Sequence, residues 1–270
     1  MRGPLSGWPR PGLLARRLVS GWRALALLLA LLGVWECYVD LGGADSLILP
    51  APHSIASSLY DDRSLLLRNF LVTAEEIVLG VAASAIAGVL FAISIHLSST
   101  LRRAVYPLLV ASQTIPIPLL APLLITWLGF GLAPKLIVVV VVCFFVIVVT
   151  TLAGLAAVDP GLIKVMRTFD ASRLRTFRHI ELPAALPGLF TGVKIAVVFA
   201  VIGAVLAEQA GSNAGLGYLV TISIPQLLTA RAWAAIVILS LFAIVLFSVL
   251  TLAERLALPW AHEPIGEPSQ

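Results

Sequence analysis

Residues 169–188 read FDASRLRTFRHIELPAALPG, a basic, proline-ended stretch between two long apolar runs. The chain around it has 270 residues, of which 60% are hydrophobic and only 12% are charged. Its mean hydropathy is +1.03. This composition excludes a water-soluble globular domain and indicates an integral membrane protein. The stretch is therefore expected to be a charged loop between two membrane segments.

Six runs are apolar enough to cross a bilayer, whose hydrocarbon core of about 30 Å needs roughly 20 helical residues. The predicted fold class is accordingly all-α, with about six transmembrane helices. The third run contains Pro116, Pro118 and Pro122, so it is expected to be kinked or interrupted. The six runs cover 23–41, 70–97, 104–128, 134–158, 187–210 and 232–256.

Lysine and arginine indicate the orientation, because they concentrate in cytoplasmic loops. If the N-terminus is cytoplasmic, thirteen cations face the cytoplasm and four face outward, so both termini and the loop are predicted to be cytoplasmic. Lys194, inside the fifth run, is expected to extend to the cytoplasmic surface. The thirteen are Arg2, Arg10, Arg16, Arg17, Arg23, Arg102, Arg103, Lys164, Arg167, Arg173, Arg175, Arg178 and Arg255, and the four are Arg63, Arg68, Lys135 and Arg231.

The chain divides around these runs. No small-residue cleavage site follows the first run, so it is predicted to be a retained helix. Topology explains the cations without nucleic acid, and the two cysteines support neither a disulfide nor a metal site. The predicted segments are a basic cytoplasmic stretch (1–22), the first transmembrane helix (23–41), an extracytoplasmic segment (42–69), a membrane core (70–260) containing a loop at 159–185, and a disordered cytoplasmic tail (261–270).

The loop is predicted to hold two short helices. Asp159 and Pro160 suit the start of the first, and Ser172 can cap the second. Pro183 and Pro187 are expected to end the second helix and set the entry to the fifth run. The residues alone leave two roles open for the apolar side chains of the loop, which either fill a groove on a partner or pack on the chain's own bundle. These side chains are Met166, Phe169, Leu174 and Phe177.

Ionisable residues in the outer half of the membrane are candidates for a pathway or gate. Glu75 and Glu76 lie near the outer start of the second run, and Glu208 lies near the outer end of the fifth. Helix neighbours point about 100° apart, so only one of the first two can face a given cavity. The carboxylates either reach water at the interface, or Glu208 and one of the pair form a gate or a substrate contact.

The broken third run is the second pathway candidate. Irregular backbone within a membrane is tolerated where protein or a water-filled cavity satisfies it. A kink would explain Pro116, but it would not require Gln113 and Thr114 beside it. These three residues are therefore predicted to line the pathway.

The loop resembles a signature of permease subunits in bacterial binding-protein-dependent importers of the ATP-binding-cassette (ABC) class. That signature has Glu-Ala-Ala, three residues, Gly, nine residues and Ile-x-Leu-Pro. Here Asp170 occupies the Gly position, and Ile180, Leu182 and Pro183 match its end, whereas residues 164–166 are Lys-Val-Met. The resemblance continues through SQTIPIPLLAPLLITWLGFGLAPK (112–135), the CFF of 143–145, ALPGLFTGVKIA (185–196) and AVLAEQAGSNAGLGYL (204–219).

The resemblance implies a type I importer-like fold in the bacterial plasma membrane, whose loop docks as coupling helices on a cytoplasmic ATPase. Asp170 is expected to adopt the left-handed turn that Gly would take. The implied partners are two ATPase subunits, a second permease copy and an extracytoplasmic binding protein. This chain has no phosphate-binding loop motif, so ATP and Mg²⁺ are expected on the partner and no cofactor or metal here. The implied coupling residues are Arg167, Phe169, Asp170, Ala171, Ser172, Arg173, Phe177 and Pro183.

The substrate is less well defined by the residues. Within the family, QTIPI (113–117) and the glutamates of the second run resemble permeases for thiamine-precursor pyrimidines, with riboflavin, sulfonate and nitrate importers as alternatives. An ion-coupled secondary transporter is a rival class, but no repeat of broken helices supports it. An intramembrane enzyme would need a nucleophile with its base or a metal cluster, and no such group is visible.

Overall fold

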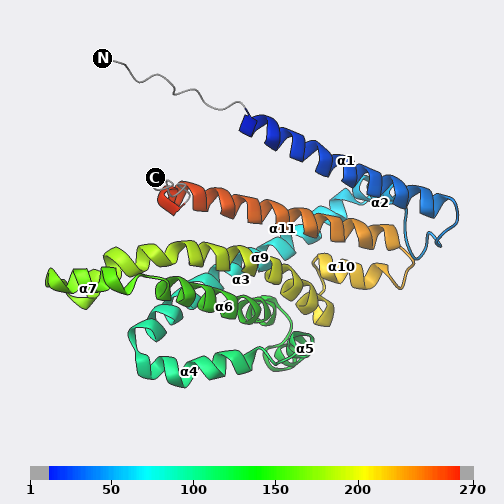
Figure 1. The fold of residues 1–270 in the computed structure, drawn as a ribbon. Coiled ribbons are helices and arrows are strands. Elements are labelled where there is room, and N and C mark those ends of the chain that lie inside the picture. The colour runs from blue at the N-terminus through cyan, green and yellow to red at the C-terminus, as the bar shows by residue number, and fades with distance from the viewer. Residues whose placement is uncertain (1–11, 262–270) are drawn as a thin grey trace, which may run out of the picture.

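In the computed structural model, the described residues are 12–261, and they form helices without strands (Figure 1). The N-terminal part of the expected segment 1–22 and residues 262–270 of the expected tail lie outside this range. The helices are α1 (Gly12–Asp40), α2 (Pro52–Asp61), α3 (Arg63–Leu97), α4 (Ser99–Ser112), α5 (Ile117–Leu128), α6 (Leu132–Ala156), α7 (Pro160–Thr168), α8 (Arg173–Thr176), a π-helical turn (Phe177–Glu181), α9 (Leu182–Gly211), α10 (Leu216–Ser223), α11 (Thr229–Ala257) and a 3₁₀ turn (Pro259–Ala261).

Four helical segments of the described chain are long and apolar enough to cross a membrane, namely α3, α6, residues 173–211 and α11. The pair α4 and α5 could form a fifth crossing, and its two helices are bent by 97° relative to each other. The predicted interruption of the third run is therefore confirmed. The first predicted run, 23–41, lies largely in α1, which begins at Gly12 and is not among these candidate crossings of the described chain.

The centre of the bundle is the packing of α3, α6 and α9, with α11 beside α9 and the α4–α5 arm projecting from the bundle (Figure 1). Small side chains of α9, including Ala196, Ala200 and Ala204, lie in the same buried cluster as Cys143 and Ile147 of α6. Small residues let two helices approach closely, which is how membrane helices gain packing energy without a hydrophobic drive between them.

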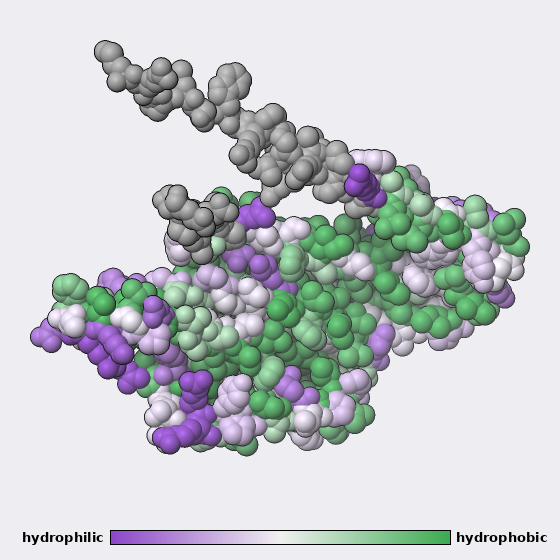
Figure 2. All heavy atoms as spheres, in the orientation of Figure 1, coloured by the Kyte–Doolittle hydropathy of each residue, from purple (hydrophilic) through white to green (hydrophobic). Residues whose placement is uncertain are grey.

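Polar side chains gather at the ends of this bundle. Figure 2 shows hydrophobic side chains over much of the visible face and hydrophilic ones concentrated around α7 at one end. The opposite end carries α10, α2 and the end of α1 (Figure 1). At that end Arg231 of α11 donates to both oxygens of Asp62, at 2.9 and 2.7 Å, and these bonds hold the pKa of Asp62 below its usual range.

The α6–α9 contact predicts a strict size limit at Gly188. A Cβ atom there would lie 2.7 Å from the backbone oxygen of Thr150, which cannot move aside like a flexible side chain. We expect Gly188→Ala to destabilise the protein by about 1–3 kcal/mol, as overpacking does. Thermal unfolding in detergent measures this loss.

Gly33→Ala is the matched control, because a Cβ at Gly33 of α1 meets no atom within 4 Å. Alanine is also a better helix former than glycine, so this variant should be neutral or slightly more stable. Equal melting temperatures for the two variants would contradict the proposed size limit.

Candidate functional site

The loop between α6 and α9 forms the two short helices predicted from the sequence. Asp159 caps α7, since its Oδ1 accepts from the backbone N–H of Gly161 at 2.7 Å, and Pro160 occupies the first turn. Ser172 caps α8, because its hydroxyl oxygen accepts from the N–H of Arg175 at 3.3 Å. Both predicted caps are confirmed.

Asp170 forms the turn between α7 and α8. Its φ angle is +56°, the left-handed conformation expected at this position. The N–H of Asp170 donates to the carbonyl of Arg167 at 3.1 Å, and the N–H of Ala171 donates to the carbonyl of Met166 at 3.0 Å. These two bonds are the Schellman pattern that satisfies the last carbonyls of a helix, so aspartate here makes the turn that the family's glycine would make.

The expected stop at Pro183 and Pro187 is wrong. The helix runs on from Arg173 to Gly211, with Pro183 in the first turn of α9 and Pro187 inside it. The reason is the π-helical turn, in which the N–H of Leu182 donates to the carbonyl of Phe177, five residues back. Wider local turns of this kind let a membrane helix accommodate proline by re-pairing backbone groups.

The apolar side chains of the loop divide between the two roles left open by the sequence. Phe169 is 75% exposed and Leu174 is 72% exposed, so both are available to a partner. Phe177 is only 8% exposed and packs with Leu155 and Ala185 of the chain's own bundle. The prediction that Phe177 contacts the ATPase is therefore corrected, because this residue lies in the segment continuous with α9 and faces α6.

The remaining coupling candidates lie around the exposed pair. Arg167, Asp170, Ser172 and Arg173 are exposed, whereas Ala171 and Pro183 are half-buried. The guanidinium of Arg173 donates to the carbonyl of Leu97, the last residue of α3, at 2.9 Å. The sequence did not indicate this bond, which joins the loop to α3.

A second link joins the same two elements. His96, near the end of α3, lies 2.9 Å from Glu181 in the π-helical turn, measured between Nε2 and Oε2. The loop is thereby attached to α3 as well as to α9.

At the opposite end of the bundle, two membrane helices hold the start of α10. The Oδ1 of Asn69 accepts from the backbone N–H of Gly215 at 2.8 Å. The hydroxyl oxygen of Thr73 accepts from the backbone N–H of Leu216, also at 2.8 Å. The Oε2 of Glu208 accepts from the N–H groups of Gly217 at 2.6 Å and Tyr218 at 3.3 Å. Side chains of α3 and α9 thus satisfy the first N–H groups of α10, and the carboxylate suits the positive end of its dipole.

Glu208 is consequently a buried structural residue in this conformation. It is 1% exposed, and its Oε1 accepts from the hydroxyl of Thr73 at 2.6 Å. Of the two alternatives that the sequence left open, access to water at the interface does not hold for Glu208. The glycines of GLGY (215–218) explain how the loop comes so close, because a Cβ at Gly215 would lie 2.2 Å from the carboxyl carbon of Glu208.

Beside Glu208 lies a second buried acid, Glu76. Its Oε1 accepts from Nζ of Lys135 at 2.7 Å, and it is 0% exposed, whereas Glu75 is exposed. The prediction that these two neighbours point in different directions is confirmed. Lys135 lies in the first turn of α6, and its ammonium group points to this buried carboxylate rather than to solvent.

An open pocket of about 440 Å³ adjoins this pair. It lies among the start of α6, the first half of α3 and the loop before α10. Its polar lining consists of Glu75, Glu76, Lys135, Ser212 and Asn213.

The bend between α4 and α5 exposes Gln113, Thr114 and Pro116. The hydroxyl of Thr114 donates to the carbonyl of Ala111 at 2.8 Å, which satisfies one acceptor at the broken helix end. Gln113 also lines a largely apolar pocket of about 400 Å³ between α4 and α6. In the single chain, these polar groups lie on an open face of the bent arm.

Comparison with known proteins decides the family. Residues 84–258 match the family described as binding-protein-dependent transport system inner membrane components. The chain belongs to this family. It is a multi-pass permease subunit of an ABC importer, a membrane component without catalytic activity of its own.

Two curated relatives and one solved structure illustrate the similarity. The permease is 36% identical over 233 residues to the formylaminopyrimidine transport permease protein of Halalkalibacterium halodurans, covering 86% of this chain and 93% of that protein. It is 32% identical over 244 residues to a riboflavin transport system permease protein of Chloroflexus aurantiacus, covering 88% and 91%. A chain of an amino acid ABC transporter solved with histidines shares the fold at 16% identity, with a TM-score of 0.59 over 73% of this chain and 96% of that chain.

One further charged residue of the permease differs from its expected position. Lys194 does not extend to the surface, because its ammonium group donates to Glu254 of α11 at 2.7 Å and both side chains are largely buried. A buried ammonium group is costly unless it is paired, so α9 and α11 share this ion pair.

Sequence reasoning missed Asn69, Thr73, Lys135 and Glu254 as partners of the buried groups. One signal was available for the first two, because Asn69, Thr73 and Glu76 recur at positions i, i+4 and i+7 along α3 and therefore share one helix face. No spacing of neighbouring residues predicts the other two partners, Lys135 of α6 and Glu254 of α11.

The attachment of α10 predicts that Glu208→Ala destabilises the end of the permease at which α10 lies. The N–H groups of Gly217 and Tyr218 would lose their acceptor, and each buried unsatisfied group costs about 1–3 kcal/mol. We expect a lower melting temperature and faster hydrogen exchange at residues 215–218.

Gln209→Ala is the control, since Gln209 is the exposed neighbour of Glu208 on the same helix. Its effect should stay within about 0.5 kcal/mol. If both variants kept the same amide protection at 215–218, the structural role of Glu208 would be refuted.

Proposed function

We propose that this permease carries a small organic nutrient, best represented by a thiamine-precursor pyrimidine, from an extracytoplasmic binding protein to the cytoplasm. Transport is driven by two ATPase subunits that bind ATP and Mg²⁺, and the pathway forms between two copies of the permease. Both termini face the cytoplasm. The observation that carries the transport mechanism is the loop with exposed Phe169 and Leu174 at the end of a continuous helix.

The loop is suited to bind an ATPase because its apolar side chains are exposed while its backbone is fixed. Phe169 and Leu174 flank the turn at Asp170, and cations such as Arg167 surround them. An exposed aromatic and an exposed leucine on a rigid turn can fill a groove at little entropic cost. The loop is the contact that we assign to the ATPase.

Movement of the loop would reach the membrane through two connections. Residues 173–211 form one helical segment of 39 residues, about 58 Å long at 1.5 Å per residue. The bond from Arg173 to Leu97 adds α3 as a second route. Closure of the ATPase pair would therefore move α9 and α3 together, and the outer ends of both helices hold α10 through Asn69, Thr73 and Glu208.

The pathway in this proposal runs past the outer pocket and the bent arm. Glu75, with the Glu76–Lys135 pair behind it, provides polar lining on the outer side. Gln113, Thr114 and Pro116 provide it at the bend, where a second permease copy would enclose them. Glu208 acts as a support for the outer end rather than as a substrate contact.

The pyrimidine assignment rests on similarity to the Halalkalibacterium halodurans permease, whose name specifies formylaminopyrimidine. The relative named for riboflavin makes riboflavin the second candidate. Both are nitrogen heterocycles, and a binding protein would deliver either of them.

The coupling assignment predicts that Phe169→Ala combined with Leu174→Ala uncouples the transporter. Hot-spot side chains contribute more than about 1 kcal/mol each, so removal of two should weaken ATPase association at least about tenfold. Co-purification of the ATPase and binding-protein-stimulated ATP hydrolysis in nanodiscs measure the loss.

Leu67→Ala is the matched control, because Leu67 is also an exposed leucine, 58% exposed, but lies on α3 near the opposite end. It should leave association unchanged. A double variant that binds the ATPase and transports at the normal rate would show that the loop is not the coupling contact.

The substrate assignment predicts uptake of labelled hydroxymethylpyrimidine or formylaminopyrimidine that requires both the gene and ATP. Cells with and without the gene are compared at low substrate concentration, before and after ATP depletion with the ion gradient preserved. An excess of unlabelled riboflavin serves as competitor. If pyrimidine uptake is the same with and without the gene, pyrimidine is eliminated as the substrate. Inhibition of the uptake by riboflavin would favour riboflavin, the second candidate.

A further inference from the structure

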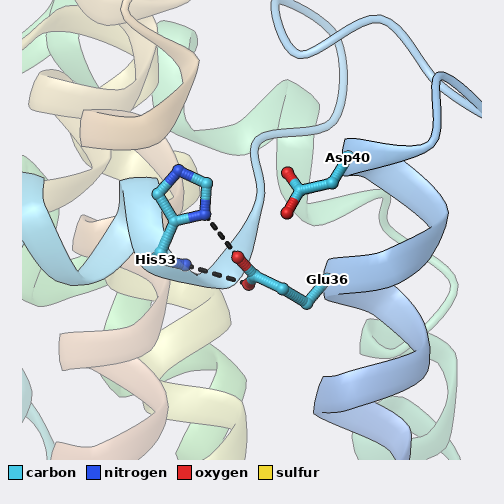
Figure 3. A group of neighbouring side chains, drawn as sticks. All are labelled: Glu36, Asp40 and His53. Carbon is cyan, nitrogen blue, oxygen red and sulfur yellow. Dashed lines mark hydrogen bonds and ion pairs between the residues drawn. The ribbon is translucent and has the colours of Figure 1, made fainter.

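A cluster of potential metal ligands lies where α1 ends and α2 begins, at the end of the bundle remote from α7 (Figure 1). Within residues 12–261, Glu36, Asp40 and His53 are the one group of three acidic, histidine or cysteine side chains whose ligand atoms lie within 4.8 Å of one another. Figure 3 shows the carboxylates of Glu36 and Asp40 on α1 and the imidazole of His53 on α2 facing one another.

Local structure brings these three side chains together. Glu36 and Asp40 are four residues apart on α1, so they lie on the same helix face. Pro52 and His53 open α2, and the chain returns from α1 through a turn in which Gly42 has φ +80°. Two carboxylates in this relation repel each other unless a cation lies between them.

Glu36 and His53 already hold each other in position. The Oε2 of Glu36 accepts from the backbone N–H of His53 at 3.2 Å, which caps α2 where Ala51 offers no side-chain cap. The Oε1 of Glu36 makes a short contact with Nδ1 of His53. The other ring nitrogen, Nε2, lies 3.1 Å from the hydroxyl of Ser54. A histidine ligand is commonly fixed through its second nitrogen in this way.

No comparable contact accounts for the position of the Asp40 carboxylate. This carboxylate makes no hydrogen bond within the described range 12–261, yet it faces the pair formed by Glu36 and His53 (Figure 3). An ion pair between Glu36 and His53 alone would not require a second carboxylate. The group therefore carries one negative charge more than its imidazole can neutralise.

We propose that Glu36, Asp40 and His53 bind a divalent transition-metal ion, with Zn²⁺ as the best fit and water completing the coordination. One imidazole nitrogen with two carboxylate oxygens suits Zn²⁺, whereas Ca²⁺ and Mg²⁺ prefer oxygen ligands alone. Tetrahedral bonds of about 2.0–2.2 Å place ligand atoms roughly 3.4 Å apart. To admit the ion, Nδ1 of His53 and Oε1 of Glu36 must therefore separate from their short contact, while the ligand atoms, now within 4.8 Å of one another, adjust to that spacing. The exposed side of the group leaves room for water.

Bound metal would join α1 to the outer end of the bundle. Other contacts of this part of α1 include the backbone bond from His53 to Glu36 and the edge-to-face packing of Trp35 on Trp233, with ring centroids 5.3 Å apart. Metal–ligand bonds to Glu36 and Asp40 of α1 and to His53 of α2 would join the two helices directly. The site is independent of the transported substrate and of the ATPase.

The test uses the full-length permease in nanodiscs with its affinity tag removed, titrated with Zn²⁺ by calorimetry. We expect one saturable site per chain, and Asp40→Asn should weaken it at least about tenfold, because even indirect partners of a metal site contribute 10- to 100-fold. Asp40→Asn leaves the contact between Glu36 and His53 intact, so its effect separates metal binding from the ion pair. His53→Gln should abolish saturable binding.

Asp61→Asn is the matched control, since Asp61 is an exposed carboxylate on α2 outside the group. Its affinity for Zn²⁺ should equal that of the natural chain. Co²⁺ provides a spectroscopic check, because its visible absorption reports coordination number and should be lost in His53→Gln. The absence of saturable binding, or equal affinities for Asp40→Asn and Asp61→Asn, would overturn the proposal and leave an ion pair that caps α2.

Discussion

The close approach of α6 and α9 is the constraint on which the rest of the structure depends. In hydrocarbon, helices gain little from burying apolar side chains against one another, so their association relies on tight contact between small residues. Gly188 and Gly192 face Thr150 at distances that exclude a side-chain carbon, and a Cβ at Gly154 would lie in a tight contact, 3.0 Å from the backbone of Ala185. This contact fixes α9 as the axis of the bundle. Helices α3 and α11 pack on that axis, and buried ion pairs tie α3 to α6 and α11 to α9.

Because α9 is continuous with α8, one rigid element connects the charged loop with the outer end. The π-helical turn makes this possible by absorbing Pro183, which would otherwise interrupt the backbone ladder. At the far end, Glu208 turns the helix terminus into an anchor for α10. A displacement applied at the loop is therefore not dissipated at a flexible joint between the two ends. The arrangement suits a subunit that receives mechanical work on one side of a membrane and changes access on the other.

Much of this architecture was predictable from local sequence patterns. Asp159, Ser172 and Asp170 act within a few residues of their own position, so their caps and turn followed from the sequence, as did the break at 113–116. Contacts between distant helices were not predictable. Lys194 was expected at the surface, and the partner of Lys135 was not foreseen, because the sequence shows hydropathy but not the carboxylate that a neighbouring helix supplies. Phe177 was misassigned for the same reason, since its burial depends on where α6 lies. The helix continues through Pro183 only because of a π turn, and no sequence pattern predicted that turn.

Aspartate at the turn between α7 and α8 has a consequence for the energetics of assembly. A glycine there would sample many backbone conformations in a free loop, and ordering it on a partner would cost conformational entropy. Asp170 has fewer backbone conformations to lose, but it enters the left-handed region less readily than glycine does. The hydrogen bonds donated by the N–H groups of residues 170 and 171 are therefore what hold this turn in place. The loop therefore meets its partner preorganised, which favours slow dissociation over adaptability. A turn that is already ordered loses little conformational entropy when a partner binds.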